Sequence, residues 1–105
     1  MKMKAVVVGS GPWAQNHLRA YQQCKEVEVA GLVGMTPTSA VDDVARQFGI
    51  PGVFRDVREA VRAVKPDILD VATNPHYRLE ALQAAQGLGV KLFILEKPLA
   101  LTPDE

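Results

Sequence analysis

This sequence of 105 residues has a single cysteine, no long apolar run and no excess of either charge. The single cysteine, Cys24, cannot form a disulfide within the chain. No apolar run approaches the roughly 20 residues that span a bilayer, and the apolar run near the start is too short for a signal peptide. Twelve basic residues balance twelve acidic ones without a basic stripe, which argues against nucleic-acid and membrane partners. A cytoplasmic protein is therefore expected.

What the chain does contain is a regular alternation of apolar runs and helical patterns. Short apolar runs predict strands at residues 5–8, 27–33, 52–54, 68–72 and 90–95. Helical spacing and helix start signals predict helices at residues 12–24, 37–48, 57–65 and 75–88. This order predicts an α/β fold: one domain over residues 1–105, with a Rossmann-type doubly wound parallel sheet of about five strands and helices on both faces.

Cap signals indicate where two of these helices begin and end. Thr36, with Pro37 at the first helical position, predicts the start of the second helix, and Gly49 predicts its end. Asp56 is the expected cap of the third helix, with Glu59 three residues later in a capping-box arrangement. The expected buried face of the second helix is Val41, Val44, Ala45 and Phe48.

A glycine-rich turn follows the first strand, where residues 9–14 read G-S-G-P-W-A. Gly9 allows the chain to turn sharply, and Gly11 allows a pyrophosphate to approach the backbone. Ala14 is small enough for the following helix to pack closely on the sheet. The N-terminus of that helix offers unpaired N–H groups to an anion. The turn therefore predicts a dinucleotide-binding site, although such turns also occur without a ligand; its residues are Gly9, Ser10, Gly11, Pro12, Trp13 and Ala14.

Two polar residues fall within apolar patterns. His17 lies on the first predicted helix, and we favour a structural or solvent-facing role over contact with a ligand. Asp70 interrupts the apolar run of the fourth strand, where a buried carboxylate needs a partner. We favour an anchored structural carboxylate over a catalytic one. No metal site is predicted.

Three motifs occur in order along the chain: G-S-G-P-W-A at residues 9–14, V-A-T-N-P-H at 71–76 and E-K-P-L at 96–99. Their order and spacing resemble the N-terminal domain of the glucose–fructose oxidoreductase, inositol dehydrogenase and rhizopine-catabolism (Gfo/Idh/MocA) family. The resemblance covers essentially the whole chain and implies a nicotinamide dinucleotide as cofactor. It also implies a second α/β domain with an open antiparallel sheet, which brings a histidine and an aspartate for proton transfer with the hydroxyl of a small-molecule substrate.

The resemblance also implies roles for particular residues. Glu96 and Lys97 match the pair next to the nicotinamide ring, and Lys97 is the expected catalytic residue because a cation stabilises a developing alkoxide. Outside this motif, Lys97 would be interpreted as a solvated lysine after a strand. The loop expected beside the ribose and the nicotinamide consists of Thr73, Asn74, Pro75 and His76.

Three departures from the family pattern affect the expected site. Gly34, Met35 and Thr36 are expected beside the adenosine ribose, yet none of them is the acidic residue that normally holds its hydroxyls. Without that carboxylate the 2′-phosphate of NADP is not repelled, so we favour NADP over NAD. Pro12 removes one N–H from the phosphate-binding turn. Arg78 stands where the family often has a second histidine, which changes the substrate side.

Several functional hypotheses follow. A helix start signal at residues 102–105 indicates a truncated domain, and the alternative is a short exposed tail. We expect part of an NAD(P)-dependent oxidoreductase acting on a sugar, polyol or related hydroxyl compound, inactive without its second domain. The alternatives are a free-standing nucleotide-binding or protein-interaction module and, less favoured, a methyltransferase. The open edge of the fifth strand is compatible with a homo-oligomer.

Overall fold

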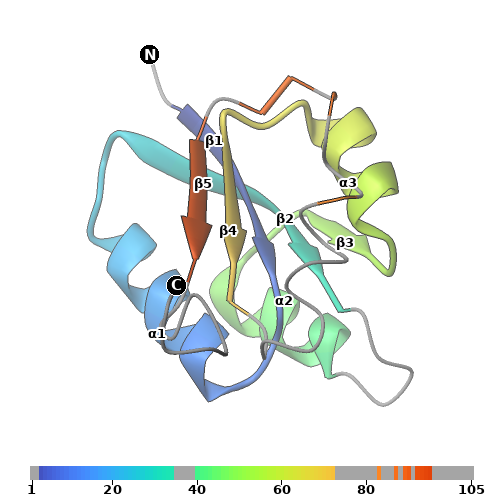
Figure 1. Cartoon of the computed structure of the whole chain (residues 1–105). Coiled ribbons are helices and arrows are strands. Elements are labelled where there is room, and N and C mark those ends of the chain that lie inside the picture. The colour runs from blue at the N-terminus through green and yellow to red at the C-terminus, as the bar shows by residue number, and fades with distance from the viewer. Residues whose placement is uncertain are drawn as a thin grey trace, which may run out of the picture.

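The computed structural model describes residues 3–34, 40–72, 83, 87, 89–90 and 92–95. Within this part of the chain, five strands form one sheet in the order β3-β2-β1-β4-β5 (Figure 1). They are β1 (Met3–Val8), β2 (Val27–Val33), β3 (Gly52–Phe54), β4 (Ile68–Val71) and β5 (Leu92–Leu95). Every neighbouring pair runs parallel. The predicted parallel sheet is confirmed, with β1 at its centre.

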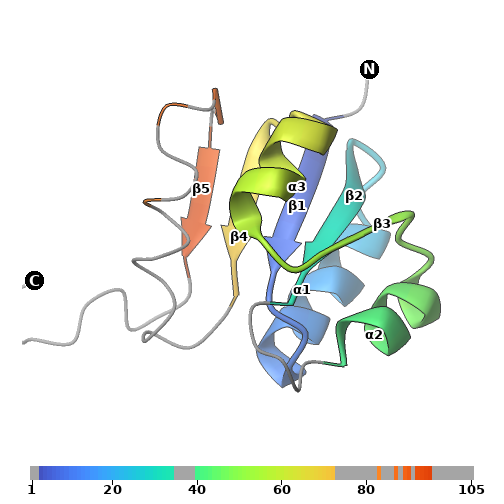
Figure 2. The same cartoon turned by 90° about the vertical axis from the view of Figure 1, so that its right-hand side faces the viewer.

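Helices pack on both faces of this sheet. α1 (Pro12–Gln22) and α2 (Val41–Phe48) cover one face, and α3 (Val57–Val64) covers the other (Figure 2). Successive side chains of β1 alternate between the faces, so Val7 joins the core under α1 and α2, whereas Val6 and Val8 join the core under α3. None of the helices described is long and apolar enough to cross a membrane. The doubly wound arrangement is the one that the sequence predicts.

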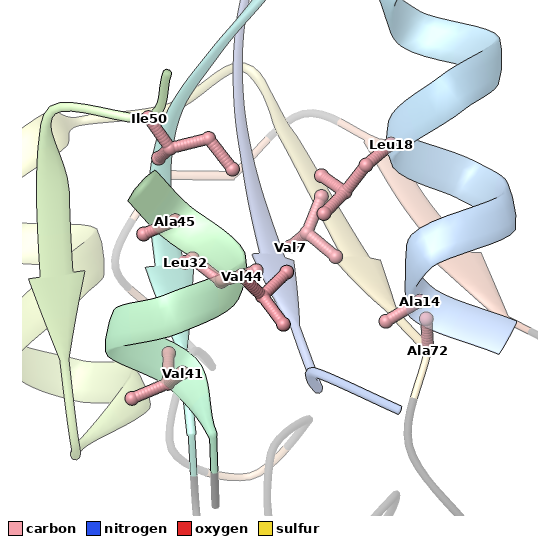
Figure 3. Close-up of a cluster of buried hydrophobic side chains, with 9 residues drawn as sticks. All are labelled: Val7, Ala14, Leu18, Leu32, Val41, Val44, Ala45, Ile50 and Ala72. Carbon is pink, nitrogen blue, oxygen red and sulfur yellow. The ribbon is translucent and has the colours of Figure 1, made fainter. Parts of the chain in front are cut away.

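The core under α1 and α2 follows the helical spacing of their apolar residues. Ala14 and Leu18 lie one turn apart on α1, and both are buried. Val41, Val44 and Ala45 supply the buried face of α2, as their spacing predicts. The cluster in Figure 3 consists of Val7, Ala14, Leu18, Leu32, Val41, Val44, Ala45, Ile50 and Ala72. This cluster anchors α1, and with it the glycine turn, to the centre of the sheet.

Several predicted ends are wrong by one or two residues. α1 ends at Gln22 instead of residue 24, because the N–H groups of Gln23 and Cys24 donate to carbonyls only three residues back and tighten the chain into a turn. β1 begins at Met3 instead of residue 5, and α3 ends at Val64 instead of residue 65, because Lys65 has a left-handed φ of 54°. β4 ends at residue 71 instead of 72, and β5 begins at residue 92 instead of 90. The two strands pair only over this length, from Ile68 with Leu92 to the last residue of each.

Asp56 is the cap of α3, as predicted, but its side chain bonds the second helical residue and not Glu59, the third, as the expected capping box requires. The Asp56 side chain accepts a hydrogen bond from the Arg58 N–H at 2.8 Å. Gly49 follows the end of α2 with a φ of 68°, the left-handed conformation that ends many helices. Phe48, expected on the buried face of α2, is partly buried against the core. Local cap signals therefore place these helix ends correctly.

Other expected elements fall outside the described residues. The predicted start of the second helix at residue 37 is wrong: α2 begins at Val41, because its hydrogen bonds start at Ala40, whose carbonyl oxygen accepts from the Val44 N–H at 3.0 Å while its own backbone is not helical. Thr36 and Pro37 themselves lie outside the described part. The helix predicted at residues 75–88 also lies outside it, apart from residues 83 and 87. The prediction of a helix at residues 75–88 therefore stays untested.

A buried carboxylate ties α1 to the sheet. Asp70, on β4, has a side chain that is 1% exposed. Its Oδ2 accepts a hydrogen bond from the Tyr21 hydroxyl at 2.7 Å, and both carboxylate oxygens lie within 2.8 Å of His17 Nδ1. An ionised carboxylate only accepts, so Nδ1 carries the proton in this contact. His17 and Tyr21 lie one turn apart on α1, so the cluster has the structural role expected of Asp70 and His17.

The same cluster changes the titration of Tyr21. Burial of the side chain, and then the hydrogen bond and negative charge of Asp70, raise the pKa of the Tyr21 hydroxyl well above its usual range. The folded state therefore favours the neutral phenol, which donates to the carboxylate.

Removing the carboxylate should destabilise the fold strongly. Asp70→Ala removes the acceptor of the hydrogen bonds from His17 Nδ1 and the Tyr21 hydroxyl, and we expect the free energy of unfolding to fall by about 2–4 kcal/mol. Asp42→Ala is the matched control, because Asp42 is 63% exposed and contacts Arg55 at 3.5 Å; a change within about 0.5 kcal/mol is expected there. Urea unfolding followed by circular dichroism measures both. If Asp70→Ala and Asp42→Ala unfolded at the same urea concentration, the hydrogen bonds to Asp70 would not be what holds α1 on the sheet.

Tyr21 should lower stability at alkaline pH. In the unfolded chain its hydroxyl ionises near pH 10, whereas the folded chain keeps that proton to higher pH. Above about pH 10 the unfolded state binds fewer protons, so the free energy of unfolding decreases as pH rises. Tyr21→Phe should remove this part of the slope and cost about 1 kcal/mol at neutral pH. Urea unfolding midpoints of Tyr21→Phe and of the unsubstituted chain, measured between about pH 8 and 11, test this prediction. Midpoints that fall with pH in parallel in the two proteins would contradict it.

Candidate functional site

The carboxyl ends of β1, β2 and β4 meet at one edge of the sheet, and the arrowheads in Figure 1 point to it. The Gly9 N–H donates to Val33 O at 2.7 Å, and the Ala72 N–H donates to Val8 O at 2.9 Å. The chain that leaves β1 is therefore held between the ends of both neighbouring strands. β1 leads on to β2 on one side and pairs with β4 on the other, so the strand order reverses here. Ligands of doubly wound sheets bind at this switch point.

Gly9 is required by its own surroundings. Its φ is +124°, and a Cβ there would collide with the carbonyl oxygen of Ala72, inside the 3.0 Å that Cβ atoms normally keep. No side chain fits between the turn and the end of β4. The Ala14 methyl group lies 3.5 Å from that Cβ position and is fully buried, so a small residue is also needed there. Both positions have the tight geometry that the sequence predicts.

Gly11 has a different reason to lack a side chain. It is the cap of α1, with φ −80° and ψ −171°, a backbone conformation that any residue adopts. A Cβ at this position would meet nothing within 4 Å. Packing within the described chain therefore does not require glycine here, whereas a group bound against the backbone would. The open space at Gly11 is the feature that the predicted approach of a pyrophosphate requires.

The first turn of α1 supplies hydrogen-bond donors beside Gly11. The first helical bond runs from the Gln15 N–H to Gly11 O at 3.0 Å, so the N–H groups of Gly11, Trp13 and Ala14 have no partner within the helix. Pro12 has no N–H, which removes one donor. The first turn contains no acidic residue. Three N–H groups at the positive end of a helix dipole fit an anion such as a phosphate.

The structure adds Gln15 to this group. Its side-chain Nε2 donates to Ser10 O at 3.1 Å in a half-buried contact. Sequence reasoning missed it, because a glutamine at this helical position looks like an ordinary surface residue. The usable signal is its place one turn after a glycine cap, from which a long amide side chain reaches back to the preceding turn.

Within the described part of the chain, two hollows border α1. One, of about 320 Å³, opens along α1 toward β4 and β5, and it adjoins the glycine turn through Trp13, which is 66% exposed. Its lining is Trp13, Asn16, His17, Ala20, Tyr21, Asp70 and Ile94. The other, of about 510 Å³, lies at the opposite end of the strands, beside the C-terminal ends of α1 and α2. Of the residues that line the first hollow, Trp13 alone belongs to the predicted site.

The structure brings some predicted site residues together and leaves others outside its description. Gly9, Ser10, Gly11, Pro12, Trp13 and Ala14 form the turn and the start of α1. Gly34 follows β2 at the same edge, where its N–H donates to Phe54 O at 3.0 Å. The predicted residues outside the described part are Met35, Thr36, Thr73, Asn74, Pro75, His76, Glu96 and Lys97. Among the described residues, no group of three or more His, Cys, Asp or Glu could hold a metal ion.

Comparison with known sequences gives a family. Residues 3–105 match the family GFO_IDH_MocA, an oxidoreductase family with an NAD-binding Rossmann fold. A D-apiose dehydrogenase from Paraburkholderia graminis is 28% identical over 101 residues, which are 96% of this chain and 26% of that protein. The chain therefore spans about a quarter of the length of this relative.

Solved structures share the fold. An oxidoreductase from Agrobacterium radiobacter, in complex with NAD+, L-tartaric acid and magnesium, gives a TM-score of 0.85 at 24% identity over 97% of this chain and 29% of that one. Scyllo-inositol dehydrogenase from Lactobacillus casei, with bound NAD(H) and scyllo-inositol, gives 0.81 at 20% identity over 97% of this chain and 30% of that one. The family match and the shared fold show that this chain belongs to the GFO_IDH_MocA family and has its NAD-binding Rossmann fold.

Proposed function

We propose that this chain binds a nicotinamide dinucleotide at the glycine turn and serves hydride transfer between that cofactor and a sugar, polyol or related hydroxyl compound. The observation that carries the proposal is the difference between the two glycines. Gly9 is needed for the fold, whereas Gly11 leaves open space beside the N–H groups of α1, and packing among the described residues gives no reason for a glycine there. When bound, the dinucleotide supplies the hydride acceptor or donor.

Hydrogen bonds from the N–H groups of α1 should contribute more to the free energy of pyrophosphate binding than the helix dipole does. An exposed charge at a helix end gains about 0.3–1 kcal/mol from the dipole. A hydrogen bond to a charged group contributes about 1.5–3 kcal/mol, and Gly11, Trp13 and Ala14 offer three N–H groups. The backbone donors therefore supply most of the expected affinity, and their orientation matters.

Chemistry on the substrate needs more than the cofactor site. The chain spans only 26% of the D-apiose dehydrogenase and 30% of the scyllo-inositol dehydrogenase. We infer that a second domain binds the substrate and exchanges its hydroxyl proton, and that the isolated chain binds the cofactor without turnover. The names of both relatives support a sugar or polyol as the substrate class.

In this proposal Lys97 has the catalytic role, with Glu96 beside it. Lys97 follows β5 by two residues in the sequence, and Leu95 of β5 pairs with Val71 at the carboxyl end of β4. A cation at this edge would stabilise the alkoxide that develops on the substrate oxygen. Residues 73–76, which follow β4 in the sequence, would border the ribose and the nicotinamide.

We also infer a preference for NADP over NAD. Gly34 follows β2 at the edge where the adenosine ribose is expected, and neither Met35 nor Thr36 after it is acidic. A carboxylate there would accept hydrogen bonds from the ribose hydroxyls of NAD and repel the 2′-phosphate of NADP. Its absence removes both effects and favours the phosphorylated cofactor.

Calorimetric titration of the 105-residue chain with NADH and, separately, with NADPH tests the proposal. Micromolar binding of either dinucleotide would support a working cofactor site. A folded chain that binds neither would instead favour the alternative function, a protein-interaction module without a cofactor. Circular dichroism on the same sample establishes that the chain is folded.

Gly11→Ala should separate binding from folding. A Cβ at Gly11 has room within the described chain, so the urea midpoint should change little. Dinucleotide affinity should fall by about tenfold or more, because the methyl group would displace the pyrophosphate from the N–H donors. Gly9→Ala is the contrasting variant and should lower stability, since its Cβ would collide with Ala72 O. Unchanged affinity in Gly11→Ala would show that no phosphate approaches this turn.

Supplying the missing acid should change the cofactor preference. We expect Gly34→Asp to weaken NADPH binding relative to NADH by about tenfold, because the carboxylate repels the 2′-phosphate and accepts from the ribose hydroxyls. Gly34→Asn is the control of equal size without the charge. Calorimetry with both dinucleotides measures the ratio of affinities. The same ratio in both variants would mean that residue 34 acts only through its size.

A further inference from the structure

Gln15 binds two consecutive carbonyl groups of the glycine turn. Its side-chain Nε2 donates to Ser10 O at 3.1 Å, and its backbone N–H donates to Gly11 O at 3.0 Å. We propose that Gln15 is a positioning residue for the cofactor, which holds the Ser10–Gly11 peptide so that the Gly11 N–H faces the pyrophosphate. This inference rests on the proposed function of the turn.

The geometry of the peptide unit links the Ser10 carbonyl to the Gly11 N–H. In a trans peptide the C=O and the N–H point to opposite sides. Because Ser10 O is turned toward the Gln15 side chain, the Gly11 N–H faces the other side of the turn. Pro12 supplies no N–H, so Gly11 is one of three donors and its direction has a large effect on affinity.

The hydrogen bond from Gln15 restrains rotation of this peptide. A peptide flip changes ψ of Ser10 and φ of Gly11, and glycine accepts φ values of either sign. The flipped peptide would present a carbonyl oxygen, with its partial negative charge, where the anion needs a donor. The hydrogen bond from Gln15 opposes this flip, and half burial of the contact makes it stronger than a fully exposed one.

The chemistry of the amide fits this role. A glutamine side chain donates through Nε2 and carries no charge. An ionised glutamate at the same position has no donor and would place a negative charge beside the phosphates. Since the first turn of α1 contains no acidic residue, the donation from Gln15 orients the peptide while the turn stays favourable for an anion.

Gln15→Met tests the inference, because methionine keeps the side-chain length and helix propensity but lacks the donor. Gln22→Met is the matched control, since Gln22 is exposed at the other end of the same helix. We expect the Kd of the dinucleotide that the chain binds more tightly to rise about five- to tenfold in Gln15→Met and to stay unchanged in Gln22→Met. Urea unfolding of both variants measures stability in parallel.

Nuclear magnetic resonance adds a measurement, the chemical shift of the Gly11 amide, that would not change selectively if Gln15 only stabilised the fold. In the ¹⁵N-labelled chain at saturating cofactor, the amide proton of Gly11 should shift on binding. Gln15→Met should reduce that shift while the shift at the Ala14 amide, on the helix itself, persists. Gln15→Glu should weaken binding further than Gln15→Met, and this extra loss should shrink at high salt because it comes from charge.

The outcomes separate this inference from the proposed function. Weaker binding in Gln15→Met, with the reduced shift confined to Gly11, supports the positioning role. Equal binding by Gln15→Met and the unsubstituted chain overturns the inference and leaves the proposed function standing. Reduced shifts at both Gly11 and Ala14, together with lower stability, overturn it as well, because Gln15 would then only hold the helix. If the unsubstituted chain binds neither dinucleotide, both proposals fail.

Discussion

The close approach of the glycine turn to the end of β4 is the constraint on which the site depends. Gly9 has no room for a Cβ because of the Ala72 carbonyl oxygen, and its N–H donates to Val33 O at 2.7 Å. These contacts determine where the chain leaves the sheet and in which direction α1 begins. A helix dipole acts mainly within the first turn. A displacement of α1 would therefore move its N–H donors out of range of a ligand at the switch point.

Asp70 restricts α1 in a way that the apolar core does not. Burial of a side chain such as Leu18 contributes about 1.5–3 kcal/mol but depends little on direction. The hydrogen bonds from His17 and Tyr21 to Asp70 require one rotation and one height of the helix along β4. Asp70 lies two residues before Ala72, so the same short segment of β4 orients α1 and meets Gly9. We infer that the apolar cluster supplies most of the free energy that holds α1 on the sheet, whereas the hydrogen bonds to Asp70 determine the orientation of α1.

Local signals predicted most of the described elements, whereas contacts between elements were not predictable. The bounds of β2 and β3 agree with the prediction, because an apolar run and its flanking turn residues are adjacent in the chain. The sequence indicated that Asp70 needs a partner, but His17 and Tyr21 are 53 and 49 residues away on another element. Gln15 was missed for a different reason: its bond to Ser10 depends on a side-chain conformation that no residue pattern signals.

Pro12 and Gln15 have opposite effects on the same set of donors. Pro12 takes one N–H away from the turn, but its fixed φ suits the first helical position and stiffens the start of α1. Gln15 holds the peptide just before that position through Ser10 O. Donors held in place before binding lose less entropy when a ligand arrives. In the proposed site, the smaller entropy loss of three donors held in place offsets the missing fourth donor. A proline at the first position of α1 is therefore compatible with the proposed binding of a phosphate.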